Sequence, residues 1–440
     1  MGGTDGTDRC LETEHWIERN VGIEVYSSST PGTGGKIKER PEDFVVEEVA
    51  RIKLSDEGSF TVIRVKKVNW DTLNFVRVLA KKLKISQRRI EYAGTKDKRA
   101  VSIQYFSIYG LSDEQVEGLR NVRIRDVEIE ILGKSRSRIS LGDLLGNKFF
   151  VRVRGADSTP VPETLRELEE RGVPNFFGLQ RFGTMRFITH RVGLEILRGN
   201  YEEAFWIYVA MPFEGENEEI REVRRELWET RDPIIGLREF PNYLRYEKIL
   251  LQALREGKSE EEALLMLPKN LKLMFIHAYQ SYVFNRTLSE RIREFETLRY
   301  VEEDDVVGFF DSHGIKEEFS PIEWRMKRVK FLMSVRRCAL ALPLPGYGSE
   351  LRGWAGEVVK EILSEDGIGL ENFRQEHKEF SSKGGYRLAE MPFSEFEYEV
   401  EGVEADRGAN GKENVKFRFF LPKGSYATVF LREFTKSCLM

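Results

Sequence analysis

Residues 92–100 read Tyr-Ala-Gly-Thr-Lys-Asp-Lys-Arg-Ala and place one carboxylate, Asp97, among three cations. Strand-like runs flank this stretch: Ile90–Ala93 precedes the glycine, and apolar residues alternate with polar ones from Val101 to Tyr105. The pattern predicts a loop held rigidly between two strands. Nearby positive charges favour the ionised form of a carboxylate, so we expect Asp97 to be available as a nucleophile or base. A surface turn with an ion pair is the alternative interpretation of the same residues.

Strand and helix signals surround this loop. Phe44–Val49 and Phe60–Val65 are strand-like, and Asp71 is a suitable N-cap for a helix whose apolar side chains share one face as far as Leu83. Asn147–Arg154 alternates apolar and polar residues as a strand does. The first part of the chain is therefore expected to form a sheet-rich domain.

The middle of the chain has a different pattern. Helical periodicity dominates residues 174–388, and strand signals return over Phe393–Val403 and Val415–Leu421. This order is typical of a helical domain inserted into a sheet-rich one. We expect an α+β fold with four parts: a flexible Ser/Gly/Thr/Pro-rich leader over 1–35, the two parts of the sheet-rich domain over 36–173 and 389–440, and the insert over 174–388.

Composition excludes several classes of protein. The 440 residues exceed what one core usually supports, and 40% of them are hydrophobic, so a globular protein of two or more units is expected. Three scattered cysteines form neither a disulfide framework nor a metal motif, and the five histidines show no ligand spacing with them, so no metal is expected. The sequence has no run of eighteen apolar residues and no signal peptide, which predicts a cytoplasmic protein.

Charge is unevenly distributed along the chain. The net charge is −4, yet residues 81–100 contain eight lysines and arginines against two acidic residues. A basic patch of this kind is compatible with RNA binding, and also with a solvated helix face. Gly35-Lys36 does not belong to a P-loop, because Thr30 stands where the first glycine is required and Ile37 where a Ser or Thr is required. A nucleotide-triphosphate site is therefore not expected.

The loop at 92–100 resembles the catalytic loop of the TruD family of pseudouridine synthases. Further segments that resemble motifs of this family follow in the family's order: Lys38–Glu48, Gly146–Phe149, Asn175–Gly183, Thr189–Gly193, Ala278–Asn285, Leu421–Thr428 and Leu431–Glu433. The resemblance covers about residues 36–435. It implies a pseudouridine synthase catalytic domain, with a mixed β-sheet and flanking helices, interrupted by a mainly helical TRUD domain.

The resemblance also implies an activity and a set of site residues. The activity is the isomerisation of a uridine in tRNA, uridine 13 by the family's usual target, to pseudouridine, with no cofactor, no metal and no protein partner. Asp97 matches the catalytic aspartate, and Lys38 matches a basic residue of the active site. The substrate-contacting positions of the family match Phe44, Asn147, Phe149 and Tyr426. Phe149 stands where other pseudouridine synthases place a tyrosine beside the target base.

These residue types suit the chemistry, but other interpretations exist. A uridine in folded RNA has to be extruded before it can react, and aromatic faces can stack on the extruded base, although strand aromatics are more often core residues. The enzyme could act on another position of tRNA or on another RNA, or the chain could be a non-catalytic RNA-binding protein on the same fold. A carboxylate beside the RNA backbone is repelled, which argues against pure binding. The charged segments 201–265 and 296–336 are candidates for selecting the RNA.

Overall fold

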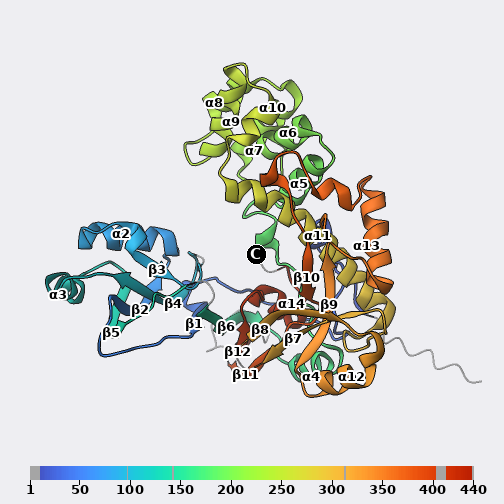
Figure 1. Cartoon of the computed structure of the whole chain (residues 1–440), viewed down its shortest axis with the longest axis horizontal. Helices are drawn as coiled ribbons and strands as arrows, with labels where there is room; N and C mark the ends of the chain where they lie inside the picture. The colour runs from blue at the N-terminus through green and yellow to red at the C-terminus, as the bar shows by residue number, and fades with distance from the viewer. Residues whose placement is uncertain (1–9, 97, 141–142, 312–313, 403–412, 439–440) are drawn as a thin grey trace, which may run out of the picture.

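The computed structural model describes residues 10–96, 98–140, 143–311, 314–402 and 413–438 (Figure 1). Its larger sheet has eight strands in the order β11-β12-β6-β1-β4-β2-β5, with β3 paired to β4. Only the β1–β4 pair among the described pairs is parallel. The strands are β1 (Phe44–Ala50), β2 (Phe60–Val68), β3 (Ile90–Tyr92), β4 (Val101–Tyr109), β5 (Val127–Ser135), β6 (Leu144–Ala156), β11 (Ser394–Glu401) and β12 (Glu413–Pro422). The two sheet-rich parts of the sequence therefore meet in one mixed sheet, through the pairing of β12 with β6.

Helices α2 (Thr72–Leu83) and α3 (Asp113–Asn121) lie with β2–β5 at one end of this sheet (Figure 1). Asp71 caps α2 as predicted, since its carboxylate accepts a hydrogen bond of 2.8 Å from the Asn74 amide. The apolar face of α2 is buried with Phe106 and Ile108 of β4 in a core of its own. This end of the sheet thus has a rigid support that is separate from the main core.

Residues 174–388 contain most of the helices, several of which form a lobe above the sheets (Figure 1). The helices are α5 (Thr189–Leu197), α6 (Tyr201–Ala210), α7 (Glu218–Thr230), α8 (Pro233–Glu239), α9 (Arg245–Arg255), α10 (Glu260–Leu265), α11 (Lys269–Phe295), α12 (Met326–Ser334) and α13 (Gly353–Glu365). The sequence analysis did not predict a second sheet here. It is antiparallel, in the order β10-β9-β7-β8. Its strands are β7 (Val306–Asp311), β8 (Gly314–Pro321), β9 (Cys338–Leu344) and β10 (Gly385–Leu388).

The expectation of a flexible leader is wrong for residues 10–35, which pack against the rest of the protein. Helix α1 (Trp16–Asn20) lies within this segment, and Val21, Ile23 and Val25 are buried in the main core. The polar run that follows, residues 26–30, is largely buried too, because charged and hydroxyl side chains satisfy its hydrogen-bonding groups. The segment crosses between α4 (Val161–Arg171) and α14 (Ala427–Thr435).

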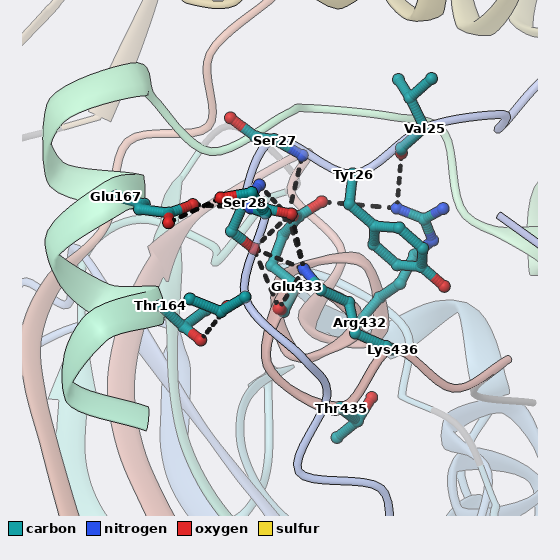
Figure 2. Close-up of polar contacts among 12 residues, drawn as sticks. Val25, Tyr26, Ser27, Ser28, Thr164, Glu167, Arg432, Glu433, Thr435 and Lys436 are labelled. Atoms are coloured by element: carbon teal, nitrogen blue, oxygen red, sulfur yellow. Dashed lines mark hydrogen bonds and ion pairs between the residues drawn. The ribbon is translucent and has the colours of Figure 1, made fainter. Parts of the chain in front are cut away.

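The contacts of this polar run come from both helices (Figure 2). The Glu433 carboxylate of α14 accepts hydrogen bonds from the amides of Ser27 and Ser28 at 3.0 and 3.2 Å. The Glu167 carboxylate of α4 accepts from the Ser29 amide at 2.6 Å. Arg432 donates to Glu18 at 2.8 Å, and both side chains are almost completely buried. The N-terminal segment therefore connects α4 and α14.

Candidate active site

A cavity of about 260 Å³ lies where β1 and β6, the loop before β4 and the start of α14 meet. All five predicted substrate-contacting or basic residues line it: Lys38, Phe44, Asn147, Phe149 and Tyr426. Asp97 lies outside the described residues. Its neighbours in the sequence, Thr95, Lys96 and Ala100, line the same cavity. The predicted residues Lys38 and Tyr426, which are 388 positions apart in the sequence, are thus brought together at one point of the fold.

Strand register explains why these residues meet. In the antiparallel ladders, Phe149 lies opposite Val46 of β1 and Phe419 of β12. Directly paired residues in such ladders point to the same face of the sheet, and residues two apart along a strand share that face. Asn147 and Phe149 therefore point to the face that also carries Phe44 and Val46.

Aromatic rings build one wall of the cavity. The Phe149 ring stacks on that of Phe419 with centroids 5.3 Å apart, and meets the Phe44 ring edge-on at 6.0 Å. Its side chain is 7% exposed. The ammonium group of Lys38 lies 4.5 Å from the centre of the Phe44 ring, a cation–π contact. Phe149 is thus a core residue and a cavity wall at the same time.

Two polar side chains in the cavity have unused hydrogen-bonding capacity. Asn147 Oδ1 and Ser425 Oγ are buried, and neither has a hydrogen-bond partner among the described residues. An unsatisfied buried polar atom usually costs about 1–3 kcal/mol. Such atoms in a cavity are suited to a ligand that presents complementary donors and acceptors.

Tyr426 is positioned by α14 and by the segment that contains Gly178. Tyr426 is the N-cap residue of α14, and its ring lies against Gly178. A Cβ atom at Gly178 would lie 3.0 Å from Tyr426 Cδ1, so a larger residue there would displace the ring. Arg387 holds the turn just before Tyr426 by donating to the Gly424 carbonyl at 2.9 Å. Burial lowers the pKa of Arg387 to about 10.

Buried polar contacts fix the loop on the N-terminal side of position 97. Lys96 Nζ forms an ion pair of 2.6 Å with Glu48, and the Lys96 amide donates to Thr72 Oγ1 at 2.9 Å. Gln104 donates to the Gly94 carbonyl. Burial raises the pKa of Glu48, and the adjacent Lys96 opposes this rise. These contacts hold the backbone of residues 94–96 against β1, β4 and α2.

The loop is also fixed on the C-terminal side. The Ala100 carbonyl accepts a hydrogen bond of 3.1 Å from the Asn69 amide. Lys67, which is completely buried, donates to Ser102 Oγ at 2.7 Å and to the Trp70 carbonyl at 3.0 Å. The sequence analysis did not identify Lys67, Thr72 or Gln104, because no local motif marks them. Glu48 was the last residue of a motif already quoted.

The predicted basic region forms an exposed surface on and after α2. Lys81, Lys82, Lys84 and Arg88 are exposed, and none of them forms an ion pair with another described residue. They do not line the candidate cavity. Their charge is therefore available to a large anionic ligand that also reaches the cavity.

The histidines do not form a metal site in the described part of the chain. His190 is buried, and its ring stacks on that of Tyr282 with centroids 5.0 Å apart. Burial lowers the pKa of His190 to about 3. Across the described ranges, no three His, Cys, Asp or Glu side chains are grouped to hold a metal ion. In the same ranges no helix has the length and apolar character needed to cross a membrane.

Sequence and structure comparisons relate this chain to proteins that bear the same name. A family model for tRNA pseudouridine synthase D (TruD) matches residues 20–434. A probable tRNA pseudouridine synthase D of Archaeoglobus fulgidus is 56% identical over 424 residues, covering 96% of this chain and 99% of that protein. A protein of the same name from Methanococcoides burtonii is 38% identical over 433 residues, covering 96% and 97%. The crystal structure described as that of the putative tRNA pseudouridine synthase D (TruD) from Methanosarcina mazei matches with a TM-score of 0.83 at 35% identity, covering 96% of this chain and 98% of that one.

These similarities, together with the mixed sheet and the cavity on it, identify the protein as a pseudouridine synthase. Enzymes of this class are isomerases. The family model spans nearly the whole chain, and the Archaeoglobus protein matches it over almost its full length. The chain therefore belongs to the tRNA pseudouridine synthase D (TruD) family. The resemblance inferred from the motifs and the α+β fold class are both confirmed.

Proposed function

We propose that this chain converts a uridine of tRNA, uridine 13, to pseudouridine, with Asp97 as the catalytic carboxylate. The observation that carries the proposal is the convergence of Lys38, Phe44, Asn147, Phe149 and Tyr426 on one cavity beside the loop that contains Asp97. The names of the relatives supply the tRNA substrate. The choice of uridine 13 rests on the family resemblance.

The cavity suits an extruded base. Its volume of about 260 Å³ lies below the roughly 300–1,000 Å³ of pockets for drug-sized ligands, so it favours a single flipped base. Phe149 and Phe44 offer apolar faces for stacking. Asn147 Oδ1 and Ser425 Oγ can pair with the imide N–H and a carbonyl of uracil, which would satisfy two buried atoms that otherwise have no partner among the described residues.

The reaction needs a carboxylate in a fixed position. The C–N glycosidic bond between N1 and the ribose breaks, the uracil rotates within the cavity, and a C–C bond forms from C5 to the same ribose carbon. C5 loses one proton and N1 gains one, so the reaction is an isomerisation. An ionised carboxylate can attack the sugar or the base in the first step and move the proton in the last. The buried contacts of Gly94, Lys96 and Ala100 hold both sides of position 97, which supports such positioning.

Asp97→Asn tests the catalytic role. The amide has nearly the same shape but is neither a nucleophile nor a base at neutral pH, so we expect tRNA binding to persist and the single-turnover rate to fall at least a hundredfold. Asp56→Asn, which changes an exposed aspartate, is the matched control and should keep the parent rate. A rate within tenfold of the parent for Asp97→Asn would show that Asp97 is not the catalytic group.

Position-resolved pseudouridine mapping on tRNA tests the substrate. A single new pseudouridine at position 13 is expected for the parent protein. Modification at another position would reject uridine 13 and keep the synthase activity. If the parent protein binds tRNA and forms no pseudouridine, the non-catalytic alternative is correct.

A further inference from the structure

The segment formed by a 3₁₀ turn (Glu323–Arg325), α12 and residues 335–337 combines exposed aromatic rings with exposed cations. Trp324 is 86% exposed and Phe331 is 64% exposed, values far above those of core aromatics. The exposed cations are Lys327, Arg328, Lys330, Arg336 and Arg337. None of the five forms an ion pair with another described residue. We call these seven residues the α12 surface.

Helical periodicity separates this surface from the core. Ile322 and Val329, seven positions apart, are buried. Trp324 and Phe331 have the same spacing and lie on the outer side, with Lys327 and Arg328 between them. The helix packs on β9, where Cys338 approaches the Val329 carbonyl at 3.8 Å. Lys327, Arg328, Lys330 and Phe331 therefore lie on the side of α12 away from Val329, and this helix is fixed to the second sheet. Trp324, Arg336 and Arg337 are exposed in the segments just before and just after the helix.

A cavity of about 590 Å³ adjoins the α12 surface. Arg336 and Arg337 line it, with Phe310, Phe393 and Phe420 among the other lining residues. Two other cations line this cavity. Lys148 is paired with Glu395 at 2.8 Å, and Arg299 is paired with Glu390 at 2.9 Å. The cavity thus offers aromatic walls and two arginines that form no ion pair within the described chain.

This cavity and the candidate active site lie on opposite faces of the large sheet. Lys148 and Phe420, which are paired in register, line the α12-side cavity, whereas Phe149 and Phe419, the next pair, face the candidate active site. A short turn of the chain connects the two cavities. Pro422 lines the α12-side cavity and Ser425 lines the candidate active site, and three residues span at most about 10 Å. Lys423 lies on this turn and is partly exposed.

We propose that the α12 surface and its cavity form a second RNA-binding site, which takes an unpaired nucleotide of the same RNA that is modified. The base enters the aromatic cavity, flanking phosphates bind Arg336, Arg337 and Lys423, and the neighbouring unpaired bases stack on the exposed rings of Trp324 and Phe331. Exposed aromatic rings interleaved with cations are the combination that binds single-stranded RNA. Residues 326–337 contain five cations and no acidic residue in a chain of net charge −4, which favours a polyanion. The proposal rests on RNA being the substrate, as proposed above.

Two variants separate the phosphate and base contributions. Arg336→Gln/Arg337→Gln removes two phosphate contacts, so the affinity for tRNA should fall at least tenfold, and the slope of log K against log salt should decrease by about two. Trp324→Ala/Phe331→Ala removes stacking, so the affinity should fall tenfold or more with the salt slope unchanged. All four side chains are exposed, so the fold should tolerate both changes.

The matched control is Arg352→Gln/Lys360→Gln, which removes the same charge from two exposed cations that are already paired with Glu350 and Glu357. It should bind tRNA as the parent does. In steady-state assays both test variants should raise KM, leave kcat at saturating tRNA unchanged, and modify the same uridine.

If both test variants bind tRNA with an affinity within twofold of the parent, the proposal is overturned. The α12 surface would then be assigned to an acidic protein as its ligand. Failure of the proposed function would look different. In that case the parent protein would form no pseudouridine, while binding through the α12 surface would still depend on these residues.

Discussion

Glu433→Gln should release the N-terminal segment from α14. The Glu433 carboxylate is completely buried, and it accepts hydrogen bonds from the Ser27 amide, the Ser28 amide and Ser28 Oγ at 3.0, 3.2 and 3.2 Å (Figure 2). It also lies 3.4 Å from the guanidinium of Arg432. Glutamine keeps the shape of the side chain and removes the charge, so all these contacts weaken together.

The structure sets the size of the effect. A hydrogen bond to a charged group contributes about 1.5–3 kcal/mol, and removing one partner of a buried ion pair costs about 3–5 kcal/mol. These contributions overlap, because they concern the same carboxylate. Arg432 also keeps its partner Glu18 at 2.8 Å, which limits the charge left unpaired. We therefore expect the free energy of opening this segment to fall by about 3 kcal/mol, or roughly a hundredfold in the opening equilibrium.

Amide hydrogen exchange measures this opening directly. Under conditions where exchange reports the opening equilibrium, the Ser27 and Ser28 amides should exchange roughly a hundredfold faster in Glu433→Gln than in the parent. Glu399→Gln is the control, because Glu399 is 72% exposed on β11 and lies 3.7 Å from Lys416. An increase of less than tenfold at Ser27 and Ser28 would refute the reasoning that the Glu433 contacts hold this segment.

Two further predictions concern the cavity wall and the buried histidine. Phe149→Ala should cost about 3 kcal/mol of stability because the ring packs in the core, and should also reduce the single-turnover rate at temperatures where the variant is fully folded. Phe149→Tyr should remain active. If folded Phe149→Ala turns over at the rate of the parent, Phe149 is not part of the active site. For His190, whose pKa burial lowers to about 3, the unfolded chain binds a proton below about pH 6.5 while the folded protein does not, so stability should fall as pH decreases from 6.5 toward 3. The slope of the unfolding free energy against pH should be steeper in the parent than in His190→Gln over this window, by the amount that the uptake of one proton on unfolding gives. Equal slopes in the two proteins would contradict the lowered pKa of His190.

Local sequence was sufficient for the parts of the fold that depend on neighbouring residues. The alternation of Asn147–Arg154 predicted a strand, and β6 runs through it. Asp71 predicted the start of α2. The residues Lys38, Phe44, Asn147, Phe149 and Tyr426 were each identified because the segment that contains them resembles a motif of the family. That they line one cavity follows from the pairing of β6 with β1 and β12, which no local pattern specifies. The division of the chain at residues 35, 173 and 388 remains a prediction.

Tertiary structure decided the features whose partners are distant in the sequence. Residues 26–30 have the composition of a linker, yet they are buried because carboxylates at positions 167 and 433 pair with them, and a composition pattern cannot reveal such partners. The same holds for the buried Lys67 and for the second sheet. In α12 the sequence contains both apolar and basic residues, and only packing against β9 decides which side is buried at Val329 and which side exposes Phe331. Sequence alone thus determined the local elements and the chemistry available to them, while burial and contact depended on long-range pairing, because a side chain's environment is set by the elements that fold onto it.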